Sequence, residues 1–163
     1  MEHLDEQKAE ALIIKYRGHI LHESIKLEFL AEKIILQHFN IKDSNKLMDF
    51  KVVIFSRQEF GFKAKLEIIV YILKNYHLDF YTENEMDLKE LDNIPSIRNN
   101  YAHAYFDFHS HTFMEMYQKD FSFSKPTTNK SKPRIDNKIL TSKKIFIEHL
   151  SLITRIQEVL KRL

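Results

Sequence analysis

Hydrophobic residues recur at three- and four-residue steps along much of the chain, which is the pattern of amphipathic α-helices. Over residues 3–39 this spacing predicts a long helix, which Gly18 would kink or split into two helices. Residues 40–45 are predicted to connect it to the next element. Asp43 or Ser44 would serve as the N-cap there, because short polar side chains satisfy the free N–H groups of a first turn.

Three further helical regions are expected in the middle of the chain. Residues 47–55 include the β-prone run VVIF, but their setting between helices favours a helix packed in the core. Residues 62–76 are predicted to form a helix with one apolar stripe. Residues 83–103 form the third region, in which Pro95 marks a kink or a fresh helix start because proline fits the first turn.

The pattern changes after residue 104. Phenylalanines alternate with polar residues over residues 104–125, which is the period of a strand and predicts a short β-hairpin or an extended arm. Residues 124–137 have the composition of a loop. A last helix is predicted from Thr141 or Ser142, as the N-cap, to the C-terminus.

These elements predict an all-α fold, a single domain over residues 1–163. It would be a bundle of four to five helices with an irregular or short β-hairpin insertion at about 104–140. Two glycines in 163 residues cannot build the glycine-rich phosphate loops of the usual nucleotide-binding folds. The absence of cysteine excludes disulfides and thiolate metal sites. With no long apolar run and no signal-peptide pattern, we expect a cytoplasmic protein that does not enter a membrane.

Charge is unevenly distributed. Residues 1–118 carry 14 basic and 19 acidic side chains, a net of −5, whereas residues 119–144 carry eight basic and two acidic, a net of +6. The basic stretch is either a contact for a polyanion or a solvated loop. Basic residues near Phe121 and Phe123 have the composition of single-stranded RNA contacts, although the two rings could equally pack onto the bundle. The candidate RNA-binding residues here are Lys125, Lys130, Lys132 and Arg134.

The stretch SIRNNYAHAYFD brings Arg98, Asn99 and His103 within two helical turns. Arginine offers a fixed positive fork for phosphate oxygens, and histidine moves protons near neutral pH. Asn99 and His103 are four apart and share a helix face, so the amide can orient the imidazole. Arg98 and His103 are five apart, about 140° around a helix, and converge better if two copies meet across a two-fold axis.

This stretch resembles the RX4–6H motif of HEPN domains (higher eukaryotes and prokaryotes nucleotide-binding), in its RNxxAH form with Ala102 before the histidine. The runs HESIKLEFLAEKIILQHF and GFKAKLEIIVYIL extend the similarity over roughly residues 10–110. The resemblance implies a helical bundle that dimerises around the motif. It also implies a metal-independent endoribonuclease, often a toxin or phage-defence effector, with Arg98 and His103 as the catalytic pair and Asn99 in support.

Several alternatives remain open at this stage. Arg98 and Asn99 could pair with acidic neighbours while His103 caps a helix end. Tyr101 could bind RNA, either by stacking on a base or through its hydroxyl on a phosphate, or it could pack in the core. Alternate positions of the predicted hairpin or arm carry Asp107, His109 and His111. On a strand these side chains would share one face and could bind a metal ion, or they could be surface residues of an aromatic arm.

The sequence therefore predicts a homodimeric, metal-independent endoribonuclease that needs no cofactor. It would leave a 2′,3′-cyclic phosphate or a 3′-phosphate, because His103 activates the ribose 2′-hydroxyl. RNA, a second copy of the chain and an antitoxin protein are the expected partners. The alternative is a non-catalytic HEPN-like module that binds a partner protein, a nucleotide or a nucleic acid.

Overall fold

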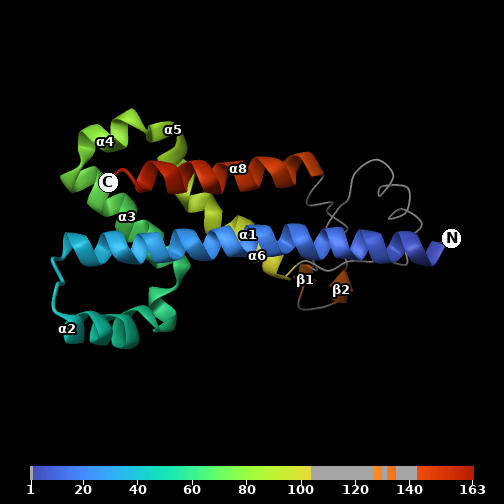
Figure 1. Cartoon of the computed structure of the whole chain (residues 1–163), viewed down its shortest axis with the longest axis horizontal. Coiled ribbons are helices and arrows are strands. Elements are labelled where there is room, and N and C mark those ends of the chain that lie inside the picture. Colours follow the sequence, from blue (N-terminus) through green and yellow to red (C-terminus); the bar gives the residue numbers. More distant parts are fainter. Residues whose placement is uncertain (1, 104–126, 130–131, 135–142) are drawn as a thin grey trace. The chain divides into compact units, whose positions relative to one another are not determined.

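The fold is helical, as predicted. A computed structural model describes residues 2–103, 127–129, 132–134 and 143–163, and Figure 1 shows their helices. Within these ranges, four α-helices have ten residues or more. They are α1 (Glu2–His38), α3 (Phe62–Tyr76), α6 (Ile94–His103) and α8 (Lys143–Leu160).

Helix α1 runs unbroken through Gly18, so the expected kink or split does not occur. A methyl group added at this exposed glycine would meet nothing within 4 Å, so no close approach of another segment requires a glycine there. The chain leaves the helix at Asn40, whose φ of 53° is the left-handed conformation that ends many helices. Asparagine tolerates this conformation better than most residues do.

The next helix, α2 (Ser44–Asp49), begins where the sequence predicted a cap. The Asp43 carboxylate accepts hydrogen bonds from the backbone N–H groups of Asn45 and Lys46, at 3.0 and 2.9 Å. A π-helical segment, Phe50–Phe55, continues the helix. The run VVIF is therefore helical, but the prediction that it packs in the core is largely wrong. Val52 and Val53 are exposed, and of this run only Phe55 is buried.

The chain comprises two compact units. Unit 1 consists of Met1–His22 and Ile97–Ser151, and unit 2 consists of Glu23–Ser96 and Leu152–Leu163. We describe each unit by itself, and the single domain expected from the sequence stays a prediction.

Unit 2 has a hydrophobic core built from α1, α3, α8, α5 (Glu85–Leu88), the 3₁₀ turn Lys89–Asn93 and the first residue of α6. Two further segments of this unit, α4 (Leu78–Glu83) and the 3₁₀ turn Gln58–Phe60, contribute no buried residue. The apolar stripe predicted for α3 consists of Leu66, Ile69, Val70 and Leu73. Three of these residues are buried, and Val70 is half-buried. The buried core residues include Leu27, Ile35, Leu66, Ile69, Leu73, Leu88, Leu91, Ile94, Ile153 and Ile156.

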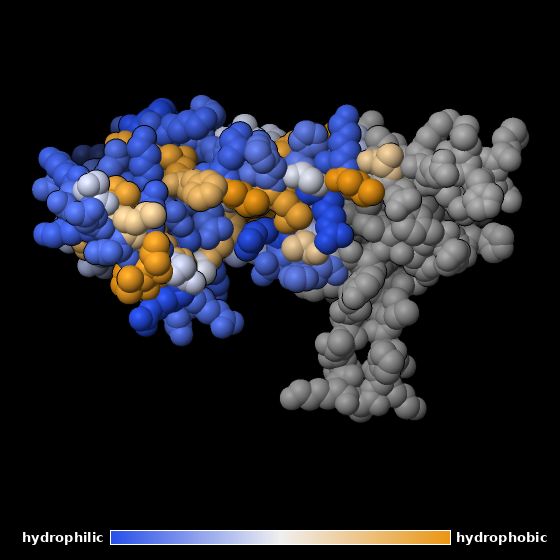
Figure 2. Space-filling view, turned by 60° about the horizontal axis from the view of Figure 1, so that its bottom comes forward, coloured by the Kyte–Doolittle hydropathy of each residue, from blue (hydrophilic) through white to orange (hydrophobic). Residues whose placement is uncertain are grey.

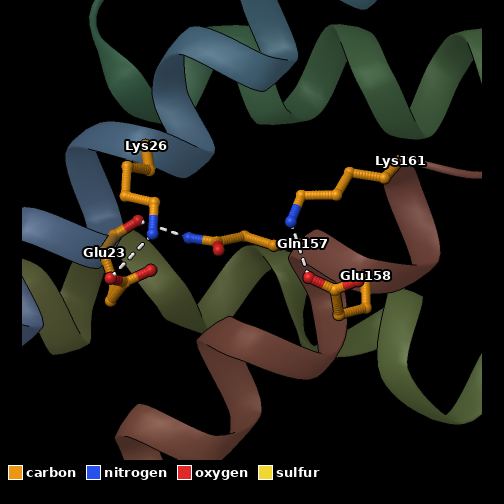
Figure 3. A network of polar contacts seen from close by, with 5 residues as sticks. All are labelled: Glu23, Lys26, Gln157, Glu158 and Lys161. Carbon is orange, nitrogen blue, oxygen red and sulfur yellow. Dashed lines mark hydrogen bonds and ion pairs between the residues drawn. The ribbon is translucent and has the colours of Figure 1, made fainter.

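A buried amide joins α8 to α1 in unit 2 (Figure 3). Gln157, which is 3% exposed, donates a hydrogen bond of 2.7 Å to the backbone carbonyl of Glu23. The Glu23 carboxylate in turn pairs with Lys26 at 2.9 Å. Because a buried amide without a partner is costly, this bond fixes how the end of α8 meets α1.

A buried ion-pair cluster joins α3 to α1 in the same unit. The Lys65 ammonium lies 2.7 Å from a carboxylate oxygen of Glu28 and 2.5 Å from one of Glu32. It also lies 5.3 Å from the centre of the Phe55 ring, a cation–π contact. Burial by itself would lower the pKa of Lys65, but the hydrogen bonds to the two glutamates raise the pKa above its ordinary 10.5.

Helix α6 begins at Ile94, in unit 2, one residue before Pro95, so the proline lies in the first turn of a new helix, which is one of the two predicted outcomes. The rest of α6, from Ile97, belongs to unit 1. Two three-residue strands, β1 (Thr127–Asn129) and β2 (Lys132–Arg134), pair antiparallel with Thr127 opposite Arg134. They lie within residues 124–137, so the prediction of a loop there is wrong over these six residues. The hairpin or arm predicted for residues 104–125, and the cap at Thr141 or Ser142, lie outside the described residues.

Large hydrophobic side chains are also exposed on the described surface. Figure 2 shows orange, hydrophobic residues scattered among blue, hydrophilic ones. Those at least 58% exposed include Ile14, Phe29, Met48, Val52 and Met86. Among the described helices, none combines the length and apolar character needed to cross a lipid bilayer.

Candidate functional site

The three motif residues lie in the last two turns of α6, in unit 1. Asn99 and His103 are exposed, and Arg98 is half-buried. His103 is the last residue of α6 that the structure describes. The amide and the imidazole therefore share a helix face that solvent reaches, which a reaction on a large polymeric substrate requires.

The helix is regular from Ile94 to His103, so helix geometry applies to the motif. Arg98 and His103 lie about 140° apart around such a helix. The guanidinium and the imidazole of one chain thus leave the helix on different sides. This supports the expectation that a second copy would complete the pair.

Tyr101 is a core residue. It is 3% exposed, its ring centre lies 6.2 Å from that of Phe146, and its hydroxyl lies 3.3 Å from Nδ1 of His149. The ring is therefore covered by α8 and offers no free face to a nucleobase. This burial supports the packing role weighed for Tyr101 from the sequence, and its role in RNA binding stays a prediction.

His149, on α8, is a titratable group that the sequence reasoning missed. Burial lowers the pKa of its imidazole, against the opposing effect of the Glu148 charge. Its ring meets that of Tyr101 edge-on, with centres 5.9 Å apart. The sequence did contain a signal that His149 is partly buried. His149 follows Phe146 by three positions and precedes Ile153 by four, which places it on the apolar face of α8.

Arg17, on α1, is the second residue that the sequence reasoning missed. Its Nη2 donates a hydrogen bond to the backbone carbonyl of Ala102, the residue before His103. Arg17 lies three positions before the fully buried Ile20, so an arginine occupies the edge of an apolar stripe. Such a basic residue on the core side of a helix is a signal for a buried polar partner.

The remaining sequence candidates are only partly described. The backbones of Lys132 and Arg134 lie in β2, whereas Lys125 and Lys130 fall outside the described residues. Within the described part of the chain, no group of three histidine, aspartate or glutamate side chains is placed to hold a metal ion. The other metal candidates fall outside the described residues, namely Asp107, His109 and His111.

A pocket of about 370 Å³ lies in unit 2 and contains none of the motif residues. It is bounded by the end of α1, the connection to α2, and the start of the π-helical segment. Its lining combines apolar residues (Phe29, Leu36, Ile41, Leu47), charged residues (Glu32, Lys33, Lys42, Lys51) and two amides (Gln37, Asn40). Because the pocket is lined by no histidine and by none of the motif residues, we place the candidate chemistry at α6 rather than here.

No protein-family model, no curated protein and no solved structure matches this chain.

Proposed function

We propose that the protein is a metal-independent endoribonuclease of the HEPN type that acts as a homodimer. The observation that carries the proposal is the exposure of Asn99 and His103 on one face at the end of α6, with Arg98 half-buried one turn earlier. The RNxxAH motif is the sequence support. A solvent-reachable imidazole with a guanidinium nearby is the minimum that cleavage of RNA without a metal requires.

The proposed reaction is an internal phosphoryl transfer. The His103 imidazole takes the proton of a ribose 2′-hydroxyl, and the 2′-oxygen attacks the adjacent phosphorus. The Arg98 guanidinium stabilises the extra negative charge on the phosphorane, and the bond to the 5′-oxygen breaks as that oxygen takes up a proton. The products are a 2′,3′-cyclic phosphate and a 5′-hydroxyl, and water can then open the cyclic ester to a 3′-phosphate.

The dimer is part of the proposal because of the angle between the two side chains. In one chain, Arg98 and His103 lie about 140° apart around α6. If two α6 helices face each other across a two-fold axis, the arginine of one chain can approach the histidine of the other. Mixing Arg98→Ala with His103→Ala protein tests this, because one of the two composite sites in a mixed dimer keeps both wild-type side chains. Recovery of cleavage in the mixture supports the shared site, and its absence argues for a site within one chain.

The direct test compares the wild type with Arg98→Ala and His103→Ala on total RNA in the presence of EDTA. Loss of the histidine is expected to lower the rate by roughly 10²–10⁴-fold, the range of general acid–base catalysis. Exposed residues on α1 supply matched controls, His19→Ala for the histidine and Lys15→Ala for the cation. Equal cleavage by all five proteins, or none by the wild type, would contradict the proposal.

The alternative is a non-catalytic HEPN-like module that binds a partner protein, a nucleotide or a nucleic acid. The pocket in unit 2, with lysines around an apolar lining, is the observation that favours it. Expression in a bacterial host separates the two functions. An active nuclease slows growth and His103→Ala relieves the effect, whereas a binding module is harmless in both forms.

A further inference from the structure

We propose that the pocket of unit 2 binds a small organic anion with an apolar body, such as a medium-chain carboxylate. Figure 1 shows how the chain turns at the end of α1 and returns as α2, and the pocket lies between these two elements. Its volume of about 370 Å³ lies within the range of about 300–1,000 Å³ found for small-molecule sites. The inference is independent of the proposed nuclease, because the pocket contains none of the motif residues.

The first wall of the pocket is one face of α1. Its lining residues there are Phe29, Glu32, Lys33, Leu36 and Gln37, which follow one another at three- and four-residue steps and therefore share a face. Leu36 is buried, whereas Lys33 and Gln37 are exposed. This face thus offers apolar surface inside the pocket and polar groups where solvent reaches it.

The second wall is the turn that ends α1, and its backbone is fixed by hydrogen bonds. Asn40 has the left-handed φ of 53°, and its N–H donates to the carbonyl of Gln37 at 3.0 Å. The N–H of Ile41 donates to the carbonyl of Leu36, also at 3.0 Å. This pair of bonds is the Schellman arrangement, which commonly brings the two outer residues into hydrophobic contact. Because Ile41 and Leu36 both line the pocket, the cap supplies part of its apolar surface.

The third wall comes from α2 and its π-helical continuation. The Asp43 cap fixes the start of α2, and Leu47, one turn later, lines the pocket. Lys51 follows in the π-helical segment Phe50–Phe55 and lines the pocket as well. π-Helical turns are rare and occur frequently at functional sites. With caps at both ends of the connection, the pocket is formed before any ligand arrives, which lowers the entropy cost of binding.

The charge of the lining selects an anion. Lys33, Lys42 and Lys51 are exposed lysines of the lining. Within the part of the chain that the structure describes, none of these three ammonium groups pairs with a carboxylate. The acidic residue of the lining, Glu32, bonds at 2.5 Å to the ammonium of Lys65, which shields its charge. An anionic group in the pocket would therefore meet more positive than negative charge.

The two features together define the class of ligand. Each buried methylene strengthens binding roughly fourfold, so the apolar surface favours a hydrocarbon body. The lysines favour a carboxylate or a similar anionic group at the solvent side. A neutral alcohol of the same length lacks the charge, and inorganic phosphate lacks the apolar body, so each should bind more weakly than the carboxylate.

The first experiment titrates the full chain with decanoate, decanol and inorganic phosphate and follows the backbone amide signals by NMR. We expect decanoate to shift the amides of residues 29–51 and to leave those of residues 152–160 unchanged, with a Kd of roughly 100 μM. Decanol should bind about tenfold more weakly, and phosphate should not saturate below about 10 mM. Scattered shifts, no saturation by decanoate, or equal affinity for decanoate and either reference compound would overturn the proposal.

The second experiment repeats the decanoate titration with Lys42→Gln/Lys51→Gln. Lys46→Gln is the matched control, because Lys46 is an exposed lysine of α2 that does not line the pocket. We expect the Kd for decanoate to rise roughly fivefold to tenfold in the double variant and to stay within about twofold in the control. The Kd for decanol should be the same in all three proteins.

An unchanged Kd for decanoate in Lys42→Gln/Lys51→Gln, or an equal rise in Lys46→Gln, would also overturn the proposal. If the double variant does not fold, the two single variants decide by the same criterion. None of these measurements uses RNA, so the failure of the proposed nuclease would leave this inference standing, and the reverse holds as well.

Discussion

Replacing Lys65 with methionine removes the cation from the buried cluster between α1 and α3. The lysine side chain is 4% exposed, and its ammonium lies 2.7 and 2.5 Å from carboxylate oxygens of Glu28 and Glu32, which are 21% and 13% exposed. Methionine keeps most of the apolar stem, so the loss is mainly electrostatic. Two carboxylates then remain close together with little water and no counter-charge.

The size of the effect follows from this geometry. Removing one partner of a buried ion pair costs about 3–5 kcal/mol, and the partial hydration of both glutamates places Lys65→Met near 3 kcal/mol. With a urea dependence of about 2 kcal/mol per molar, the unfolding midpoint falls by roughly 1.5 M. Lys63→Met is the control, because Lys63 is exposed and its ammonium lies 3.7 Å from a carboxylate oxygen of Glu67, which is exposed as well. We expect that variant within about 0.5 kcal/mol of the wild type.

Rescue and pH dependence sharpen this test. Adding Glu28→Gln and Glu32→Gln to Lys65→Met removes the stranded charges and should recover part of the lost stability. Because the pKa of Lys65 is raised above 10.5 in the folded protein, its contribution is full below pH 10.5 and is lost as the pH rises through the folded value. A free energy of unfolding for Lys65→Met that matches Lys63→Met would refute the reasoning.

Three further changes test other parts of the structure. Ser24 is fully buried, and its hydroxyl has no hydrogen-bond partner among the described residues. Ser24→Ala should therefore raise the free energy of unfolding, measured in urea, by roughly 1 kcal/mol. A lower free energy of unfolding in this variant would show that the hydroxyl has a partner. Asp43→Ala removes the N-cap of α2 and should cost about 1 kcal/mol by the same assay, with Asp43→Asn nearly neutral. Burial lowers the pKa of His149, so its protonation favours the unfolded chain and stability falls as the pH drops below about 6.5; thermal unfolding of His149→Gln should lack this decline.

The boundaries of helices could be predicted from the sequence where a single residue type decides the local backbone conformation. The helix at residues 62–76 was predicted with the limits it has, because Gly61 precedes a regular apolar stripe. Asp43 was expected as a cap, and Pro95 as a first-turn residue, since each follows from the bonding capacity of its own side chain and backbone.

The wrong predictions of secondary structure and burial have a common cause, because both depend on the tertiary contacts of a segment as well as on its own residues. The run VVIF has strand propensity, but it continues α2 as a π-helix and leaves Val52 and Val53 in solvent. The pairing of β1 with β2 depends on the register between two short segments rather than on the composition of either. Propensity is a weak prior that neighbours override.

In the candidate site, too, local features could be predicted from the sequence and long-range contacts could not. The motif and its helix were predicted, and so was the packing alternative for Tyr101. The roles of Arg17 and His149 were not, because each depends on a partner 85 or 48 positions away in the chain. No periodic pattern within a helix encodes such a partner.

The bond between Arg17 and Ala102 also bears on the order in which the protein assembles. Closing a loop of 85 residues carries an entropy cost that only a largely completed fold repays, so this contact belongs to the late stages of folding. While the chain is still leaving the ribosome, Arg17 is synthesised long before Ala102, so this hydrogen bond cannot form until residue 102 has emerged. A chain that is only partly synthesised therefore carries the whole first helix but not yet the contact between Arg17 and Ala102.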